Sequence, residues 1–210
     1  MYDVLGVEAP EFNDRTLGYW IAEHGKSLPD NIALQYFDRE ISYRELDELS
    51  NRLATGLREL GVGRADVVGI YVPNTPQYAI ALAAISKLGC TGSGISMLLA
   101  PGELANQIED AGITTLLALD ALANSVLAKT PNVPACLERV IVTGATDHLA
   151  PGEVVMPTMD GMSCINYLGL LEGASPDFEA CEAHWDDTWM IQYTGGTTGA
   201  PKGAELTVRN

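Results

Sequence analysis

The residues with the clearest capacity for chemistry lie near the C-terminus, in the run Tyr193-Thr194-Gly195-Gly196-Thr197-Thr198-Gly199-Ala200-Pro201-Lys202-Gly203. Glycines have no Cβ atom and let backbone N–H groups converge on one point, while threonine hydroxyls add donors and lysine adds a positive charge. Apolar runs precede and follow the segment, which is typical of a loop between two strands. The pattern predicts a loop that binds phosphate oxygens through Thr194, Gly195, Gly196, Thr197, Thr198, Gly199 and Lys202.

Glycine, threonine and lysine also occur together in other phosphate-binding motifs and in plain turns. A Walker A loop needs Gly-Lys-Ser/Thr at the start of a helix, whereas Lys202 stands between Pro201 and Gly203. The dinucleotide fingerprint G-x-G-x-x-G is incomplete at residues 92–94, because position 97 is methionine, and we interpret these residues as a flexible turn. A Gly- and Thr-rich hairpin without any ligand stays open as an alternative for residues 193–203. Cys181 and His184 have the spacing of half a metal site, but no second half is present.

Alternating strand and helix patterns precede the loop. Strands are predicted at 31–37, 40–42, 67–72, 113–119, 139–143 and 188–193, the first two forming a hairpin. Helices are predicted from a capping box at Ser42 and Glu45 to Leu60, at 76–89, at 101–112 and, as a short element, at 165–171. Residues 144–162 are expected to form an irregular surface segment. This alternation predicts an α/β fold with a mostly parallel sheet built from βαβ units.

Composition and charge limit the classes of function. Of the 210 residues, 47% are hydrophobic, enough for a real core, and the net charge is −16. A strongly acidic surface repels the phosphate backbone, so we expect no nucleic-acid partner. The N-terminus lacks the pattern of a signal peptide, and the apolar stretches fall short of the roughly 20 residues of a membrane span. With widely spaced cysteines, the chain is expected to be a cytoplasmic protein with reduced thiols.

Residues 193–203 resemble, at every defined position, the signature loop of the adenylate-forming enzymes, Tyr-Thr-(Ser/Gly)-Gly-(Thr/Ser)-Thr-Gly-x-Pro-Lys-Gly. This superfamily contains acyl-CoA synthetases, luciferases and the adenylation domains of peptide synthetases. The paired glycines and paired threonines look most like the acyl-CoA synthetase branch. Weaker similarities at 41–47, 61–77, 88–90 and 101–104 extend the resemblance over most of residues 16–210.

The resemblance implies that residues 1–210 are the N-terminal portion of the large AMP-binding domain of a carboxylic acid–CoA ligase. Such an enzyme uses ATP to form an acyl-adenylate with release of pyrophosphate, and coenzyme A then accepts the acyl group. Magnesium is implied as well, with Thr197 or Thr198 close to it. The family's adenine-binding strand, hinge, second catalytic lysine and most of its acyl pocket are implied downstream of residue 210. We therefore expect this fragment to contain no catalytic residue, to be inactive alone, and to self-associate through an uncovered apolar face.

A function of another class stays open. The family usually has methionine where this chain has Glu205, and histidine where it has Val208. These differences favour, as an alternative, a short non-catalytic paralogue that senses nucleotides or binds a partner. A small kinase or NTPase is a weaker alternative, because the Walker lysine geometry is absent. The identity of the carboxylic acid is left open by the sequence.

Overall fold

A seven-stranded sheet forms the centre of the molecule. The computed structural model describes residues 15–194 and 201–209. In these ranges the sheet has the order β7-β6-β5-β3-β4-β8-β9, and β1 and β2 form a separate antiparallel hairpin. The sheet is parallel from β7 to β8, and β9 is antiparallel to β8. The strands are β1 (Ile32–Tyr36), β2 (Arg39–Ser42), β3 (Val67–Tyr71), β4 (Thr91–Gly94), β5 (Ile113–Leu119), β6 (Arg139–Thr143), β7 (Ser163–Asn166), β8 (Thr188–Thr194) and β9 (Lys202–Thr207).

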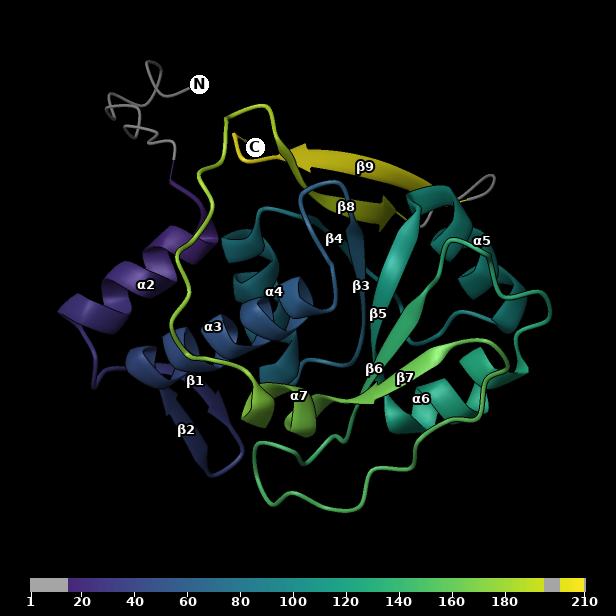
Figure 1. Cartoon of the computed structure of the whole chain (residues 1–210), viewed down its shortest axis with the longest axis horizontal. Helices are drawn as coiled ribbons and strands as arrows, with labels where there is room; N and C mark the ends of the chain where they lie inside the picture. The colour runs from purple at the N-terminus through teal and green to yellow at the C-terminus, as the bar shows by residue number, and fades with distance from the viewer. Residues whose placement is uncertain (1–14, 195–200, 210) are drawn as a thin grey trace, which may run out of the picture.

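Helices cover both faces of this sheet (Figure 1). They are α2 (Leu17–Ser27), α3 (Tyr43–Glu59), α4 (Pro76–Leu88), α5 (Pro101–Ala111), α6 (Asp120–Ser125), the 3-10 helix η1 (Leu127–Lys129) and α7 (Tyr167–Gly173). One core lies under α3, α4 and α7, and the other lies under α5 and α6. Strand residues alternate between the two: Ile141 of β6 joins the first core, whereas Val140 and Val142 join the second. The prediction of an α/β fold with a mostly parallel sheet is confirmed. Strands β3, β5 and β6 are mostly apolar because both of their faces are covered.

The order of the strands reverses beside β3. The chain passes from β3 through α4 to β4 on one side of β3, and then through α5 to β5 on the other side. Because such crossovers are right-handed, two crossovers in opposite directions place α4 and α5 on opposite faces of the sheet. The connections leaving β3 and β4 therefore separate at the carboxyl edge of the sheet. Open α/β sheets bind their ligands in the crevice that this separation creates.

The predicted N-terminal elements are confirmed. The β1–β2 hairpin is present, and the Ser42 hydroxyl accepts a hydrogen bond from the Glu45 amide at 3.3 Å to begin α3. Gly61 follows the helix with a φ of 88°, a conformation that glycine adopts without strain. One half of the capping box is wrong, since the Glu45 carboxylate accepts from the Arg39 guanidinium of β2 rather than returning to the helix start.

Two sequence interpretations need correction. Residues 92–94 are not a flexible turn, because they form the buried strand β4 between β3 and β8. A Cβ atom on Gly92 would lie 2.5 Å from the Met190 sulfur, so a small residue is required where the neighbouring side chain crosses the strand. Residues 165–171 are the end of β7 and most of α7, with the Asn166 side chain capping the helix, rather than one short helix. Residues 144–162 contain no helix or strand, as expected.

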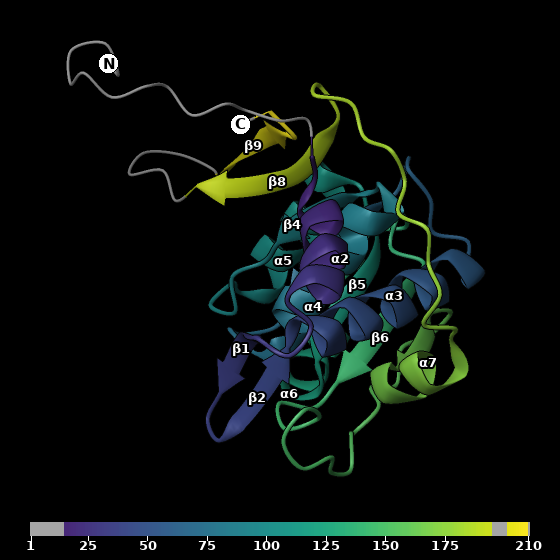
Figure 2. The ribbon, with the colours of Figure 1, turned by 90° about the vertical axis from the view of Figure 1, so that its left-hand side faces the viewer.

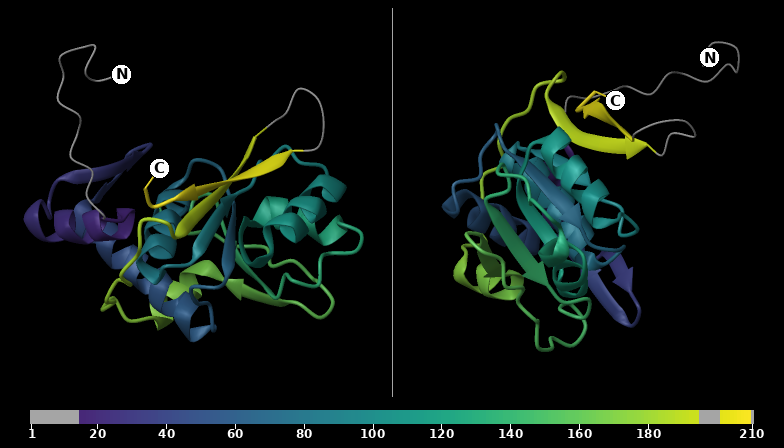
Figure 3. Two further views of the ribbon diagram at one scale, coloured as in Figure 1. Left: turned by 90° about the horizontal axis from the view of Figure 1, so that it is seen from above. Right: turned by 90° about the vertical axis from the view of Figure 1, so that its right-hand side faces the viewer.

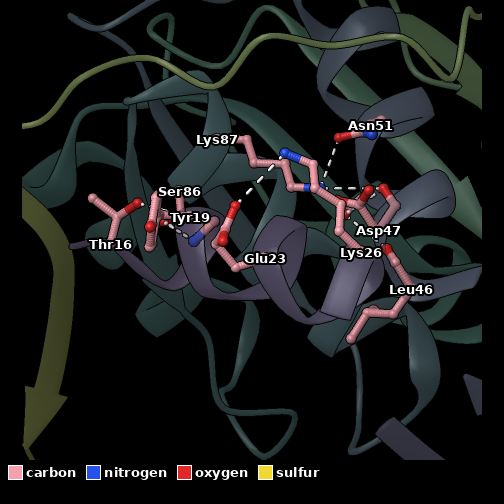
Figure 4. A network of polar contacts seen from close by, with 11 residues as sticks. Thr16, Tyr19, Glu23, Lys26, Leu46, Asp47, Asn51, Ser86 and Lys87 are labelled. Carbon is pink, nitrogen blue, oxygen red and sulfur yellow. Dashed lines mark hydrogen bonds and ion pairs between the residues drawn. The ribbon is translucent and has the colours of Figure 1, made fainter. Parts of the chain in front are cut away.

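A buried lysine joins the helices on one face, where α2, α3 and α4 lie together (Figure 2). Only 1% of the Lys87 side chain is exposed, and its Nζ, with three N–H donors, lies within hydrogen-bonding distance of four oxygens of α3. These are Asp47 Oδ1 at 2.5 Å, Asn51 Oδ1 at 2.7 Å, Ser50 Oγ at 2.8 Å and the Asp47 carbonyl at 3.1 Å (Figure 4). The network fixes α4 against α3 by directional contacts as well as by apolar packing.

Candidate functional site

A groove of about 870 Å³ opens at the carboxyl edge of the sheet. The residues around it come from three parallel strands and the segments that follow them, together with one residue of α5 and Pro201. They are Val72, Pro73, Asn74, Tyr78, Gly94, Ile95, Ser96, Met97, Leu98, Leu99, Gln107, Gln192, Tyr193, Thr194 and Pro201. The groove thus occupies the crevice expected from the reversal of strand order.

The two ends of the predicted phosphate loop meet at this groove. Thr194 is the last residue of β8 and Lys202 the first of β9, and the two are directly paired across the antiparallel ladder. Figure 3 shows this hairpin, in yellow, along one edge of the sheet. The structure therefore places Thr194 and Lys202 together, as a loop between two strands requires. Five predicted site residues lie outside the described residues, and so does the predicted magnesium contact at Thr197 or Thr198: they are Gly195, Gly196, Thr197, Thr198 and Gly199.

The charge of the groove differs from that of the whole chain. Although the net charge is −16, no carboxylate is among the described residues that line the groove. Its polar groups are hydroxyls and amides, such as those of Ser96, Gln192 and Thr194. An adjoining cavity of about 440 Å³ is lined instead by three acidic residues of α5, Glu103, Glu109 and Asp110. A polyanionic ligand is compatible with the groove and is disfavoured in the adjoining cavity.

Several groove residues were missed by the sequence reasoning. Gln107 of α5 donates through Nε2 to the Gly94 carbonyl at 3.0 Å and so ties this helix to the end of β4. Tyr78 of α4 is half-buried and borders the groove, with its hydroxyl 3.3 Å from where a Gly94 Cβ atom would stand. The signal for Gln107 was strand β4 and the signal for Tyr78 was strand β3, because residues that follow a parallel strand lie at the ligand-binding edge. Tyr71, at the end of β3, is fully buried in the core and does not border the groove.

Strand β8, which leads into the loop, is joined to α5 by a hydrogen bond between side chains. The Tyr193 hydroxyl donates to Asp110 Oδ2 at 2.5 Å, and burial together with this bond raises the pKa of the tyrosine. Tyr193 is paired with Gly203 on β9. A Cβ atom at Gly203 would lie 3.1 Å from Tyr193 Cζ and 3.2 Å from its hydroxyl oxygen. The absence of a side chain at Gly203 thus lets the tyrosine ring lie across the strand.

His148 lies against a tyrosine inside the fold. His148 is half-buried with a ring nitrogen 3.1 Å from the Tyr167 hydroxyl, and burial lowers its pKa to about 4. The described part of the chain holds no group of three His, Cys, Asp or Glu side chains close enough to bind a metal ion. All four cysteines are free thiols. None of the described helices has the length and apolar character of a membrane span.

Comparison with known proteins settles the family. The profile of the AMP-binding enzyme family matches residues 21–210. The chain belongs to the AMP-binding enzyme family. It is 33% identical over 192 residues to the medium/long-chain-fatty-acid–CoA/3-oxocholest-4-en-26-oate–CoA ligase of Mycobacterium marinum, covering 87% of this chain and 32% of that protein. It is 32% identical over 198 residues to the long-chain-fatty-acid–CoA ligase of Salmonella typhimurium, covering 86% of this chain and 34% of the relative.

The fold agrees with solved members of the same kind. The fatty acyl CoA synthetase of Mycobacterium tuberculosis superposes with a TM-score of 0.73 and 23% identity, over 93% of this chain and 36% of that one. At this identity the likeness supports the fold alone. The chain spans about a third of the length of the curated relatives that it matches.

Membership of the AMP-binding family gives the groove and the loop a common interpretation. Residues 193–203 connect two strands whose ends border a groove with no carboxylate among its described lining residues, and Lys202 stands at one of those ends. An exposed lysine and a threonine hydroxyl suit phosphate oxygens as charge and as hydrogen-bond donor. The arrangement therefore offers a positive charge and a hydroxyl donor to an anionic group at the carboxyl edge of the sheet.

Proposed function

We propose that this chain supplies the phosphate-binding part of an ATP-dependent carboxylic acid–CoA ligase, with residues 1–210 as the N-terminal portion of its AMP-binding domain. The observation that carries the proposal is the pairing of Thr194 with Lys202 at the border of a groove lined without carboxylates among the described residues. In the full-length ligase, ATP and a carboxylic acid give an acyl-adenylate and pyrophosphate, and coenzyme A then takes the acyl group to form the thioester. The relatives named above are ligases of this kind.

The work of this chain's own residues is to bind and neutralise the phosphates. The Lys202 ammonium would lie against the β- or γ-phosphate, and the Thr194 hydroxyl would donate to a phosphate oxygen. The amides of Gly195, Gly196 and Gly199 can approach closely because no Cβ atom intervenes. Bound magnesium would supply further positive charge to the triphosphate, and we assign its contact within this chain to Thr197 or Thr198.

Calorimetric titration of the chain with MgATP tests the proposal. Lys202→Ala should weaken binding about 10- to 100-fold, the range expected for the loss of one charge-assisted contact. Lys129→Ala is the matched control, because Lys129 is also exposed but lies in η1, outside the groove and the loop. Equal affinities of the wild type and Lys202→Ala would refute the role of the loop. Titration with ATP and EDTA in place of magnesium tests the metal, and unchanged affinity would refute it.

We propose that the chain alone does not catalyse the ligase reaction. It matches about a third of each relative, and the described residues offer phosphate contacts without an acid–base pair in the groove. The measurement is release of pyrophosphate from ATP with a fatty acid and coenzyme A. Turnover by these 210 residues, at a rate comparable to that of a full-length ligase, would refute this point.

The alternative of a nucleotide sensor gains no support from the geometry. It was motivated in part by Glu205 beside a phosphate loop. Glu205 is paired with Ile191 on β8, and its carboxylate accepts from the Thr188 hydroxyl at 3.3 Å, toward the end of the hairpin away from Thr194. The acid therefore does not face the loop ends, and we do not advance the sensor function.

Three expectations about partners and location also remain proposals. Self-association is supported by β9, which is the edge strand of the sheet and exposed from Lys202 to Glu205, because an unpaired edge is a template for another strand. Light scattering would test it, and a monomer at high concentration would count against it. A cytoplasmic location is supported by the four free cysteines, which suit a reducing compartment. The absence of a nucleic-acid partner rests on the net charge of −16.

A further inference from the structure

Helix α5 is packed against the strand that leads into the phosphate loop. Along β8, Ile191 and Tyr193 point to the face covered by α5 and contact the core that contains Leu104 and Ile108. The residues between and after them, Gln192 and Thr194, belong to the opposite face of the strand and are exposed. The last contact of β8 with the rest of the fold on the α5 face is therefore made by Tyr193, the residue immediately before Thr194.

This last contact is specific as well as apolar. The Tyr193 hydroxyl donates to Asp110 at 2.5 Å, joining residues that are 83 positions apart in the chain. Gly203, paired with Tyr193, leaves the space in which the ring crosses β9. Tyr193 thus lies beside the ends of both β8 and β9, and its hydroxyl is held by the Asp110 carboxylate of α5.

We propose that Asp110 is a positioning residue for phosphate binding, acting through the hydroxyl of Tyr193 on the end of β8. The inference rests on the proposed function of the loop. A strand end that is already fixed loses less conformational entropy when its donors close on a ligand, and so binds more tightly. Asp110 touches no phosphate in this scheme; it sets the place from which Thr194 and the following residues start.

Charge repulsion alone predicts the opposite effect of removing Asp110 on the affinity for phosphate, so the two explanations can be distinguished. Asp110, Glu109 and Glu103 all line the acidic cavity beside the groove. If these carboxylates acted only as charges, removal of any of them would strengthen the binding of a polyanion, because like charges repel. A positioning role predicts weaker binding for Asp110→Ala alone. Glu109→Ala is the matched control, since Glu109 is the exposed acid next to Asp110 on the same helix.

The first experiment needs no ligand. Hydrogen–deuterium exchange of the amides in residues 194–203 is compared among the wild type, Asp110→Ala, Tyr193→Phe, the double variant and Glu109→Ala. We expect about 5-fold faster exchange in both single variants, the effect of one lost hydrogen bond. The double variant should exchange no faster than either single variant, and Glu109→Ala should match the wild type. Unchanged exchange in Asp110→Ala, or additive effects in the double variant, would overturn the proposal. Unaltered exchange in α3 and β5 would show that the fold is intact.

The second experiment measures binding of MgATP to the same variants by calorimetry. Asp110→Ala and Tyr193→Phe should each raise Kd about 5-fold, and Asp110→Asn should restore most of the affinity because its amide oxygen can still accept from the tyrosine. Glu109→Ala should bind as tightly as the wild type or more tightly. An Asp110→Ala variant that binds as tightly as Glu109→Ala would overturn the inference. If the wild type bound no MgATP, the proposed function of this chain would fail, and the exchange data would still decide whether Asp110 positions the strand end.

Discussion

Replacing Asp47 by alanine should destabilise the fold more than replacing Lys87, its buried partner, by methionine. Only 1% of the charged Lys87 side chain is exposed, whereas 23% of the Asp47 side chain is exposed. Burial lowers the pKa of Lys87, and the contact with Asp47 opposes that shift. Without Asp47, the ammonium would remain buried among neutral acceptors, chiefly Ser50 and Asn51. Without the lysine charge, the Asp47 carboxylate could still reach water.

The magnitudes follow from this asymmetry. Removal of one partner of a buried ion pair costs about 3–5 kcal/mol. Lys87 keeps three of its four acceptors in Asp47→Ala, so we expect the lower end, about 3 kcal/mol. Lys87→Met keeps an unbranched side chain and removes the buried charge, leaving unpaired acceptors at a cost of about 1–2 kcal/mol. The double variant should resemble Lys87→Met and be about 1–2 kcal/mol more stable than Asp47→Ala.

Urea denaturation of the four proteins measures these differences. In a chain of this size, 3 kcal/mol corresponds to a fall in Tm of roughly 6–12 °C. Asp30→Ala is the control, because Asp30 forms an exposed ion pair with Arg44 and its loss should cost less than about 1 kcal/mol. A double variant no more stable than Asp47→Ala would refute the reasoning, since it would show that the buried charge itself is not the source of the loss.

Two further predictions concern other buried groups. Since burial lowers the pKa of His148 to about 4, the unfolded chain binds the proton more tightly than the folded one, and stability should fall by up to about 3 kcal/mol as pH drops from 6.5 to 4. His148→Gln lacks this group, so the difference in stability between the wild type and the variant should change by up to about 3 kcal/mol over that range, and parallel curves would contradict this. Gly69→Ala should cost about 1–3 kcal/mol by urea denaturation, because its Cβ atom would lie 2.7 Å from Leu116 Cδ1 in the core. Gly63→Ala, whose Cβ atom would meet nothing within 4 Å, should be nearly neutral, and equal losses in the two variants would contradict the packing argument.

The elements that were predicted correctly are those whose sequence signals are local. The capping serine at 42 acts within a few residues, and α3 begins directly after it and ends within one residue of the predicted Leu60. The strands β3, β5 and β6 were recognised because burial on both faces requires a continuous apolar run. The loop ends Thr194 and Lys202 were found by composition, and their pairing followed from the hairpin.

The errors arise where tertiary contacts override local preference. The sequence of β4 has the composition of a turn, yet its glycines are required by the side chains of the neighbouring strands, as the Met190 contact shows. Asn166 ends a strand and caps α7, so the apolar residues around it look like one helix when the partner strand β6 is not known. The burial of His148 has no local signal, because nothing near it in sequence shows that Tyr167 lies against it.

The same distinction explains what was missed in the site. A phosphate loop is defined by residues that touch the ligand, and these are adjacent in sequence, whereas the residues that hold the loop in place are distant. Asp110 is exposed on α5, and nothing near it in sequence indicates a role in the site. Its partner Tyr193 is known only when β8 is placed beside α5. Gln107, one turn earlier on α5, ties the same helix to the end of β4. Helix α5 thus braces two of the three strands whose ends border the groove, and substitutions on it should alter ligand binding without touching the ligand.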